Sequence, residues 1–283
     1  MDIFEHAEVS YPSRTCEQEE EEAAQATASS NLSPPLLLWN AELRQRLYPG
    51  GAVVPECMLL ATSRASCALL AHAFPEKQVI GSCVLPEVSM RGNTTGGALR
   101  DAGCMLYAAG AQSGALLLAI CTYDVRPERA AALARGLLSE VQAKNVIVLG
   151  AISSEQLRGG EGDPSQEPLV FMLSSGAARS AHAKPPAPLL PSGCVVPGLA
   201  AAALSHVHVR GGCAHALLSV DMVPGLAPLS LTLLASAAAA CLPPGCLAQP
   251  GGGGLCSNVA LATVRAELDA VTGGGAGGGA VFT

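Results

Sequence analysis

Short apolar runs alternate along this chain with segments in which apolar residues recur at every third or fourth position. The short runs predict strands at 55–61, 78–85, 104–109, 114–122, 145–152, 169–173 and 213–220. The recurring positions predict helices at 63–74, 126–143, 198–210, 228–242 and 257–271. Strands that alternate with helices in this way predict an α/β fold, with a mixed central sheet flanked by helices.

Capping residues mark the ends of three of these helices. Ser63 precedes the first helix and is a preferred N-cap residue. Pro127 and Glu128 open the second helix, because proline suits the first turn and a carboxylate favours the positive helix end. Gly211 and Gly212 follow the third helix, where glycine is the usual stop signal.

Composition divides the chain into three parts. Residues 1–33 carry a run of glutamates followed by small polar residues, which predicts a disordered acidic tail. Residues 34–272 contain the predicted strands and helices, and we expect them to form a single domain. Residues 273–283 begin with a glycine-rich stretch, which predicts a flexible tether of roughly 15 Å that ends in a docking tip.

Charge and hydropathy argue against two classes of partner. The net charge is −7 with only 16 basic residues, whereas nonspecific nucleic-acid binding needs clustered Lys and Arg. The longest uncharged apolar run, about 14 residues at 229–242, is too short to span a bilayer. We therefore expect neither a nucleic acid nor a membrane as a partner.

Cysteine usage indicates the compartment. The 11 cysteines are scattered through apolar runs, and their number is odd. The first residues, Met1 to Glu5, lack the basic and apolar regions of a signal peptide. We expect a cytoplasmic protein, with the nucleus as a further location, in which reduced thiols pack as small hydrophobic groups.

The sequence contains no coherent catalytic motif. It has no G-x-S-x-G elbow and no G-x-x-x-x-G-K-[ST] loop. The G-x-G-x-x-G spacing at 273–278 follows a predicted helix rather than a strand, so it is not a dinucleotide fingerprint. Asp124 and Asp221 each stand at the predicted carboxyl end of a strand, where α/β sites often lie. Turn or helix-capping roles also explain these two aspartates.

Four potential metal ligands, His206, His208, Cys213 and His215, lie within 10 residues of sequence. On a β-hairpin they would make a plausible zinc site. The alanine-rich run before them favours a helix, on which His206 and His208 point about 200° apart and cannot ligate one ion. We therefore expect no metal and no other cofactor.

Several segments match, in the same order, the segments of a known family. They are the acidic tail, the strand and helix at 57–74, the strand and helix at 116–138 with Cys121-Thr122-Tyr123-Asp124, and the segment at 143–149. The most specific piece is 188–205, which is followed by the strand at 214–221. Over roughly residues 50–283 the chain resembles the first subunit of the proteasome assembly chaperone heterodimer.

The resemblance implies a chaperone that is not an enzyme. A subunit of this family pairs with a homologous second subunit, and the heterodimer binds the α-ring of the 20S proteasome and promotes its assembly. The family's C-terminal tail, a hydrophobic residue, a tyrosine and any residue, docks between α-subunits, where its carboxylate meets a lysine. The corresponding residues here are Val281, Phe282 and Thr283, with phenylalanine in place of tyrosine.

Two other classes of function stay open at this point. One is a hydrolase- or phosphorylase-like α/β enzyme with Asp124 or Asp221 in its site, and the other is a small zinc-binding protein. If the chaperone interpretation holds, the low aromatic content of 3% leaves few aromatic anchors for pairing. We then expect the Ala/Leu faces of the helices at 198–210 or 228–242 to supply the heterodimer surface.

Overall fold

The structure is a computed structural model of the chain. It describes residues 33–94, 101–109, 114–157, 169–179, 185–221, 228–243, 246 and 254–273. Residues 1–32 of the predicted acidic tail and residues 274–283 of the predicted tether lie outside these ranges.

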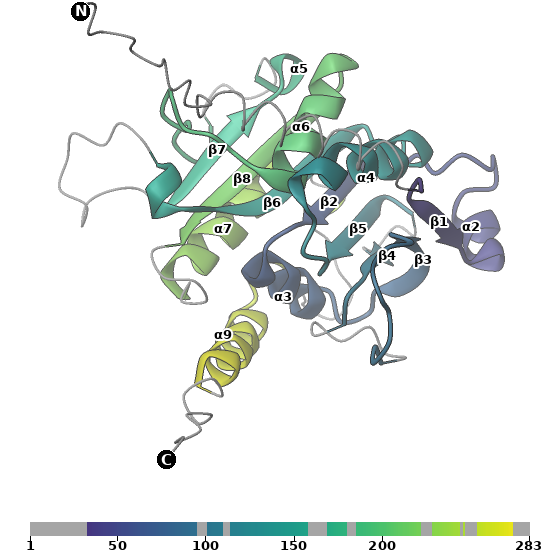
Figure 1. Cartoon of the computed structure of the whole chain (residues 1–283), viewed down its shortest axis with the longest axis horizontal. Coiled ribbons are helices and arrows are strands. Elements are labelled where there is room, and N and C mark those ends of the chain that lie inside the picture. The colour runs from purple at the N-terminus through teal and green to yellow at the C-terminus, as the bar shows by residue number, and fades with distance from the viewer. Residues whose placement is uncertain are drawn as a thin grey trace, which may run out of the picture. The chain divides into compact units, whose positions relative to one another are not determined.

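The described strands form one mixed sheet of eight strands in the order β1-β3-β4-β5-β2-β6-β8-β7 (Figure 1). Strands β5, β2, β6 and β8 are joined by parallel pairing, and β1, β3, β4 and β7 join the sheet by antiparallel pairing. The strands are β1 (Leu36–Trp39), β2 (Cys57–Ala61), β3 (Gln78–Val84), β4 (Cys104–Ala109), β5 (Leu116–Cys121), β6 (Asn145–Ser153), β7 (Val170–Ser174) and β8 (Cys213–Asp221). The predicted α/β fold with a mixed central sheet is confirmed.

Helices cover both faces of this sheet (Figure 1). Alternate residues of β2 show the two faces, since Leu59 packs in one core cluster and Leu60 in the other. The face of Leu59 is covered by α3 (Arg64–Ala73), α7 (Pro228–Cys241) and α9 (Asn258–Gly273). The face of Leu60 is covered by α4 (Pro127–Glu140) and α6 (Gly198–Val209).

The capping predictions for α3 and α6 are confirmed. The Ser63 hydroxyl accepts a hydrogen bond from the Ser66 N–H, and the Ser66 hydroxyl accepts one from the Ser63 N–H. At the end of α6, Gly211 has a φ of 71°. The Gly211 and Gly212 N–H groups donate to carbonyls in the last turn of α6, at 3.0 and 2.9 Å. This pattern ends the helix directly before β8.

Three short elements were not predicted from the sequence pattern. These are β1, α2 (Ala41–Leu47) and α5 (Gly176–Arg179), which have four, seven and four residues. In addition, α4 ends three residues before the predicted position 143. Val141 is extended and forms a bridge with Val53, and the Gln142 N–H donates to the Val53 carbonyl at 2.9 Å. Pairing with a distant segment therefore overrides the local helical pattern at this end.

Candidate functional site

The chain leaves the neighbouring strands β2 and β5 in opposite directions. After β2 it enters α3 on one face of the sheet and continues to β3, and after β5 it enters α4 on the other face and continues to β6. The two strands are parallel, with Ala61 opposite Ile120, so their carboxyl ends lie side by side. Ligands of open α/β sheets bind in the crevice at such a switch point.

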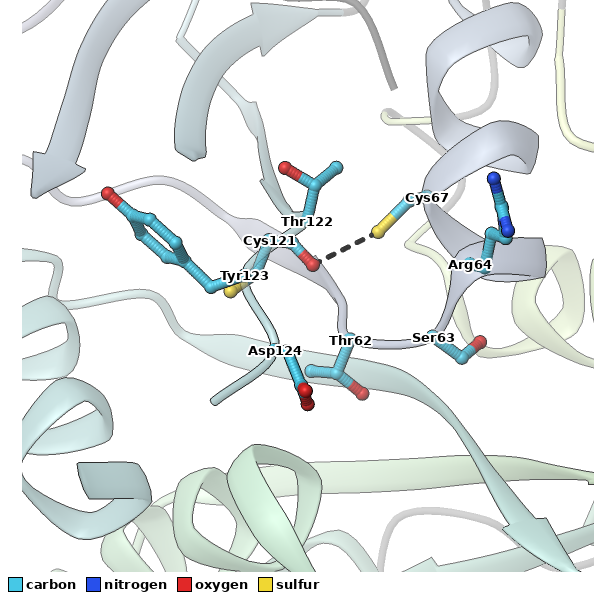
Figure 2. A pocket seen from close by; sticks show the side chains of 8 residues that line it. All are labelled: Thr62, Ser63, Arg64, Cys67, Cys121, Thr122, Tyr123 and Asp124. Carbon is cyan, nitrogen blue, oxygen red and sulfur yellow. Dashed lines mark hydrogen bonds between the residues drawn. The ribbon is translucent and has the colours of Figure 1, made fainter. Parts of the chain in front are cut away.

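A pocket of about 460 Å³ opens at this switch point (Figure 2). One side of the pocket comes from the junction between β2 and α3, and the other side comes from the end of β5. The lining residues are Thr62, Ser63, Arg64, Cys67, Cys121, Thr122, Tyr123 and Asp124. This pocket is the strongest candidate for chemistry in the described part of the chain.

The threonine and tyrosine hydroxyl groups that line the pocket bind the surrounding backbone, whereas the Ser63 hydroxyl donates to the Ser66 hydroxyl at 2.9 Å. The Thr62 hydroxyl donates to a backbone carbonyl of β6 at 3.2 Å. The Thr122 hydroxyl accepts a hydrogen bond from the Gly103 N–H at 3.1 Å, and the Tyr123 hydroxyl donates to the Cys83 carbonyl at 3.3 Å. A hydroxyl nucleophile needs a general base within hydrogen-bond reach, whereas these partners are backbone groups. The threonine and tyrosine hydroxyls therefore stabilise the backbone around the pocket, and their hydrogen-bond partners do not activate them as nucleophiles.

Cys67 is a buried thiol whose environment keeps it unreactive. Its Sγ donates to the Cys121 carbonyl at 3.2 Å, the dashed contact in Figure 2, and lies 3.7 Å from the Ala61 carbonyl. Burial raises the pKa of the Cys67 thiol well above its ordinary value, and the neighbouring Cys121 thiol adds to the shift. A thiol that stays protonated at neutral pH is a weak nucleophile.

Arg64 and Asp124 are the charged residues that line this pocket, and both are exposed. Arg64 is the first residue of α3, and Asp124 follows the end of β5. Their side chains point away from each other in Figure 2, and none of the ion pairs found among the described residues joins them. The pocket therefore has two separate charges at its rim rather than a coupled acid and base.

Of the two aspartates predicted at strand ends, Asp124 lines the pocket. Asp221 is the last residue of β8, opposite Ser153 of β6. Strands β2 and β6 separate β8 from β5, so the two aspartates belong to different parts of the same sheet edge. The sequence reasoning missed the contributions of Thr62 and Arg64. Their position in the sequence, between an apolar strand and a capped helix, could have indicated that they line a pocket.

The four potential metal ligands do not converge. His206 and His208 lie on α6, as the helical prediction requires, whereas Cys213 and His215 lie on β8. The buried His215 has its Nδ1 2.9 Å from the Ser174 hydroxyl, and the His208 Nδ1 accepts a hydrogen bond from a backbone N–H of α5 at 3.3 Å. Within the described ranges, no group of three or more His, Cys, Asp or Glu residues is placed to hold a metal ion.

The predicted docking tip, Val281, Phe282 and Thr283, lies outside the described residues, so its role stays a prediction. On the helices predicted for pairing, exposed large apolar side chains are Val209 of α6, 84% exposed, and Leu233 of α7, 50% exposed. None of the helices in the described part combines the length and the hydropathy of a bilayer-spanning segment.

Comparison with known proteins gives similarity of fold without similarity of sequence. No protein-family description matches the chain, and no curated protein matches it. Among solved structures, the chain is similar to Pyrococcus furiosus PbaA, an archaeal homolog of proteasome-assembly chaperone. The two are 14% identical with a TM-score of 0.58, over 86% of this chain and 90% of PbaA.

Two further structures have similar folds. Pyrococcus furiosus PbaB, an archaeal proteasome activator, is 12% identical with a TM-score of 0.55, over 85% of this chain and 96% of PbaB. A Thermoplasma acidophilum protein of unknown function is 13% identical with a TM-score of 0.56, over 82% of this chain and 89% of that protein. At these identities the comparisons establish a common fold, and function has to be argued from the site and the sequence.

Proposed function

We propose that this chain is a proteasome-assembly chaperone, the first subunit of a heterodimer that binds the α-ring of the 20S proteasome and promotes its assembly. The observation that carries the proposal is the fold shared with PbaA over 86% of this chain and 90% of that one. The sequence supports it separately, because the segments at 57–74, 116–138 and 188–205 resemble the same family in the same order.

The chemistry of the pocket supports a binding protein rather than an enzyme. Its threonine and tyrosine hydroxyls are hydrogen-bonded to backbone groups, and burial raises the pKa of Cys67. A nucleophilic or acid–base mechanism needs an activated group with a partner that accepts its proton. The described lining of this pocket supplies neither, which fits a protein that works through its surfaces.

The C-terminal tip is proposed as the contact with the α-ring. Val281 and Phe282 would fill an apolar pocket between α-subunits, and the carboxylate of Thr283 would meet a lysine there. Phenylalanine lacks the hydroxyl that tyrosine has at this position in the family. The loss of one hydrogen bond costs about 0.5–1.5 kcal/mol, so the tip is expected to bind more weakly than a tyrosine-containing tip.

The homologous second subunit is proposed to pack against α6 or α7. Most of the apolar surface of α7 is already committed to the chain's own core, since Leu231, Leu234 and Ala238 are 1%, 0% and 0% exposed. Among the large apolar side chains of these helices whose burial is described, Val209 of α6 and Leu233 of α7 are exposed and available to a partner. The substitutions Val209→Ser and Leu233→Ser test which helix forms the interface. Only the substitution on the helix that contacts the second subunit should reduce co-purification of that subunit.

Affinity capture from native cytosol, followed by mass spectrometry, tests the proposed function. The full chain with an N-terminal tag should recover one homologous partner together with proteasome α-subunits. The matched control is the same chain without residues 281–283, which should retain the homologous partner and lose most of the α-subunits. Recovery of neither partner by the full chain would overturn the chaperone proposal, and equal recovery of α-subunits by both chains would overturn the role of the tip.

A hydrolase- or phosphorylase-like α/β enzyme is the second candidate, and the pocket at the β2–β5 switch point is the observation that favours it. In this alternative Asp124 is the acidic group of the site. Turnover of a small metabolite by the purified chain, abolished by Asp124→Asn, would favour the enzyme over the chaperone.

A further inference from the structure

A row of three buried cysteines crosses the strands next to the pocket. Cys83 of β3 lies opposite Cys104 of β4, and Cys104 lies opposite Cys121 of β5. Their exposed fractions are 0%, 1% and 2%, and all three belong to the core on the α4 and α6 side of the sheet. Three reduced thiols are therefore held in line on one face.

Backbone hydrogen bonding distinguishes the two pairs in this row. The Thr122 N–H donates to the Gly103 carbonyl at 2.8 Å, so these two residues occupy a hydrogen-bonded position of the β4–β5 ladder. Because antiparallel ladders alternate, the next position, Cys104 and Cys121, is non-hydrogen-bonded, with Cα atoms about 4.5 Å apart and side chains close together. Disulfides span Cα separations of about 4.4–6.8 Å. The pair can therefore be bridged without movement of the strands.

The strand register and the shared core place the two thiols close to each other. A side-chain hydrogen bond with Cys121 raises the pKa of Cys104, and burial raises it further. Cys67 also lies near Cys121, but it packs in the core on the opposite face of the sheet. Since side chains alternate along a strand, the Cys121 side chain is directed toward Cys104 rather than toward Cys67.

Cys121 is the member of the row that a small oxidant can reach. It lines the pocket at the end of β5, as Figure 2 shows, whereas Cys83 and Cys104 are not among the lining residues. A pocket of about 460 Å³ has ample room for a hydroperoxide. The row therefore has one thiol at the wall of the pocket, Cys121, with Cys104 behind it.

We propose that Cys121 and Cys104 form a modification site for hydroperoxides, at which hydrogen peroxide converts the two thiols into a reversible cross-strand disulfide. The Cys121 sulfur attacks a peroxide oxygen, the O–O bond breaks, and a sulfenic acid and one water form. The Cys104 sulfur then attacks the sulfenic sulfur, the S–S bond forms, and the hydroxyl group leaves as water with the Cys104 proton.

In this reaction the two sulfurs lose two electrons and one peroxide is reduced to two waters. A thiol reductant reverses the bond by exchange. Burial keeps Cys104 protonated at neutral pH, which slows the second step. The product joins β4 to β5 beside the pocket.

Peptide mapping of the full-length chain tests the proposal. The chain is treated with hydrogen peroxide, unfolded in the presence of an alkylating reagent, and digested without reduction. Because the sequence has no Lys or Arg between Arg100 and Arg126, trypsin leaves both cysteines in one peptide. Further cleavage after Tyr107 separates Cys104 from Cys121 unless a disulfide joins them. The expected result is a joined pair that a thiol reductant separates.

Two variants keep the result interpretable. Cys104→Ala should abolish the joined pair and leave Cys121 as a sulfenic acid that dimedone labels, whereas Cys256→Ala, which removes an exposed cysteine, should leave the pair unchanged. Cys121 linked to Cys83 or Cys67 instead would overturn the proposal. Oxidation confined to the exposed Cys256 and the half-buried Cys194 would also overturn it. The wild-type digest gives the answer even if Cys104→Ala does not fold.

Discussion

The thiol of Cys67 donates a hydrogen bond to the backbone carbonyl of Cys121 across 3.2 Å, and this contact ties the first turns of α3 to the end of β5. The two residues are 54 positions apart in sequence. Their contact holds together the two chain segments that leave the sheet toward opposite faces. Both residues line the pocket at the switch point.

Cys67→Ala should lower the free energy of unfolding by about 1–2 kcal/mol. The substitution removes a buried hydrogen-bond donor and leaves a small void between α3 and the sheet. Denaturant unfolding measures the loss, and Cys256→Ala, at an exposed cysteine, is the matched control that should stay within about 0.5 kcal/mol of wild type. Equal losses of unfolding free energy in both variants would show that the hydrogen bond between Cys67 and Cys121 does not stabilise the fold.

Phe282→Tyr should strengthen binding to the α-ring by about two- to tenfold, because it restores a hydroxyl that is able to form one more hydrogen bond. Phe282→Ala should weaken binding, since it removes the aromatic ring from the tip. Both affinities are measured against purified α-rings, with Val259→Ser, an exposed apolar residue on α9, as the control that changes nothing. This prediction rests on the proposed function, and identical affinities for Tyr, Phe and Ala would contradict the docking tip.

Asp124→Asn should leave the capture of partner proteins unchanged. The carboxylate is exposed at the rim of the pocket, and no ion pair among the described residues uses it. Quantitative mass spectrometry of captured proteins, side by side with the wild-type chain, is the measurement. A loss of α-subunits from the Asp124→Asn sample would mean that the pocket takes part in partner binding.

Alkaline pH should destabilise the protein through Tyr48. Burial raises the pKa of Tyr48 from 10.0 to about 12, and its hydroxyl donates to the Gly114 carbonyl at 2.8 Å. The unfolded chain therefore ionises this group first. The contribution of neutral Tyr48 to the free energy of unfolding is fully present below about pH 10 and is lost as the pH rises toward 12. Over this range the free energy of unfolding falls by up to about 1.4 kcal/mol per pH unit.

Unfolding free energies measured between about pH 10 and 12 test this linkage. Tyr48→Phe should lose about 0.5–1.5 kcal/mol at neutral pH, because the hydrogen bond is gone, and should show a shallower decline above pH 10. Burial also raises the pKa of Cys83 to about 12 and of Cys241 to about 11, so part of the decline begins near pH 9 and persists in the variant. An unchanged slope in Tyr48→Phe would contradict the assignment.

Gly81→Ala should separate β1 from the sheet and cost about 1–3 kcal/mol. A Cβ at this position would lie 2.6 Å from the Leu38 carbonyl oxygen and 3.0 Å from the Trp39 ring, so the backbone of β1 would have to move. Gly50→Ala is the matched control, because a Cβ there meets nothing within 4 Å. Thermal unfolding of the two variants should show the loss only for Gly81→Ala.

Local signals in the sequence were sufficient for most elements. Ser63 predicted the start of α3 because its hydroxyl can cap free N–H groups, and Gly211 predicted the end of α6 because it adopts a positive φ without strain. The strand at 104–109 was predicted with its observed bounds. In each case the interactions that decide the outcome lie within a few residues along the chain.

Short elements and element ends needed contacts from elsewhere. β1 has four residues and becomes a strand by pairing with β3, and α4 stops early because Val141 pairs with Val53. The local sequence around β1 or Val141 does not indicate which distant segment it pairs with. These are the places where tertiary pairing overrides local preference.

The sequence by itself determined the order of the longer strands and helices, the absence of familiar catalytic motifs and the resemblance to one family. Only the tertiary structure placed β5 beside β2, and with it the pocket, and only the strand register set Cys104 against Cys121. The physical reason is that a strand's periodicity says which side chains share a face, whereas its neighbour is chosen by the packing of the whole sheet. Sites formed between strands distant in sequence therefore emerge only when the chain has folded.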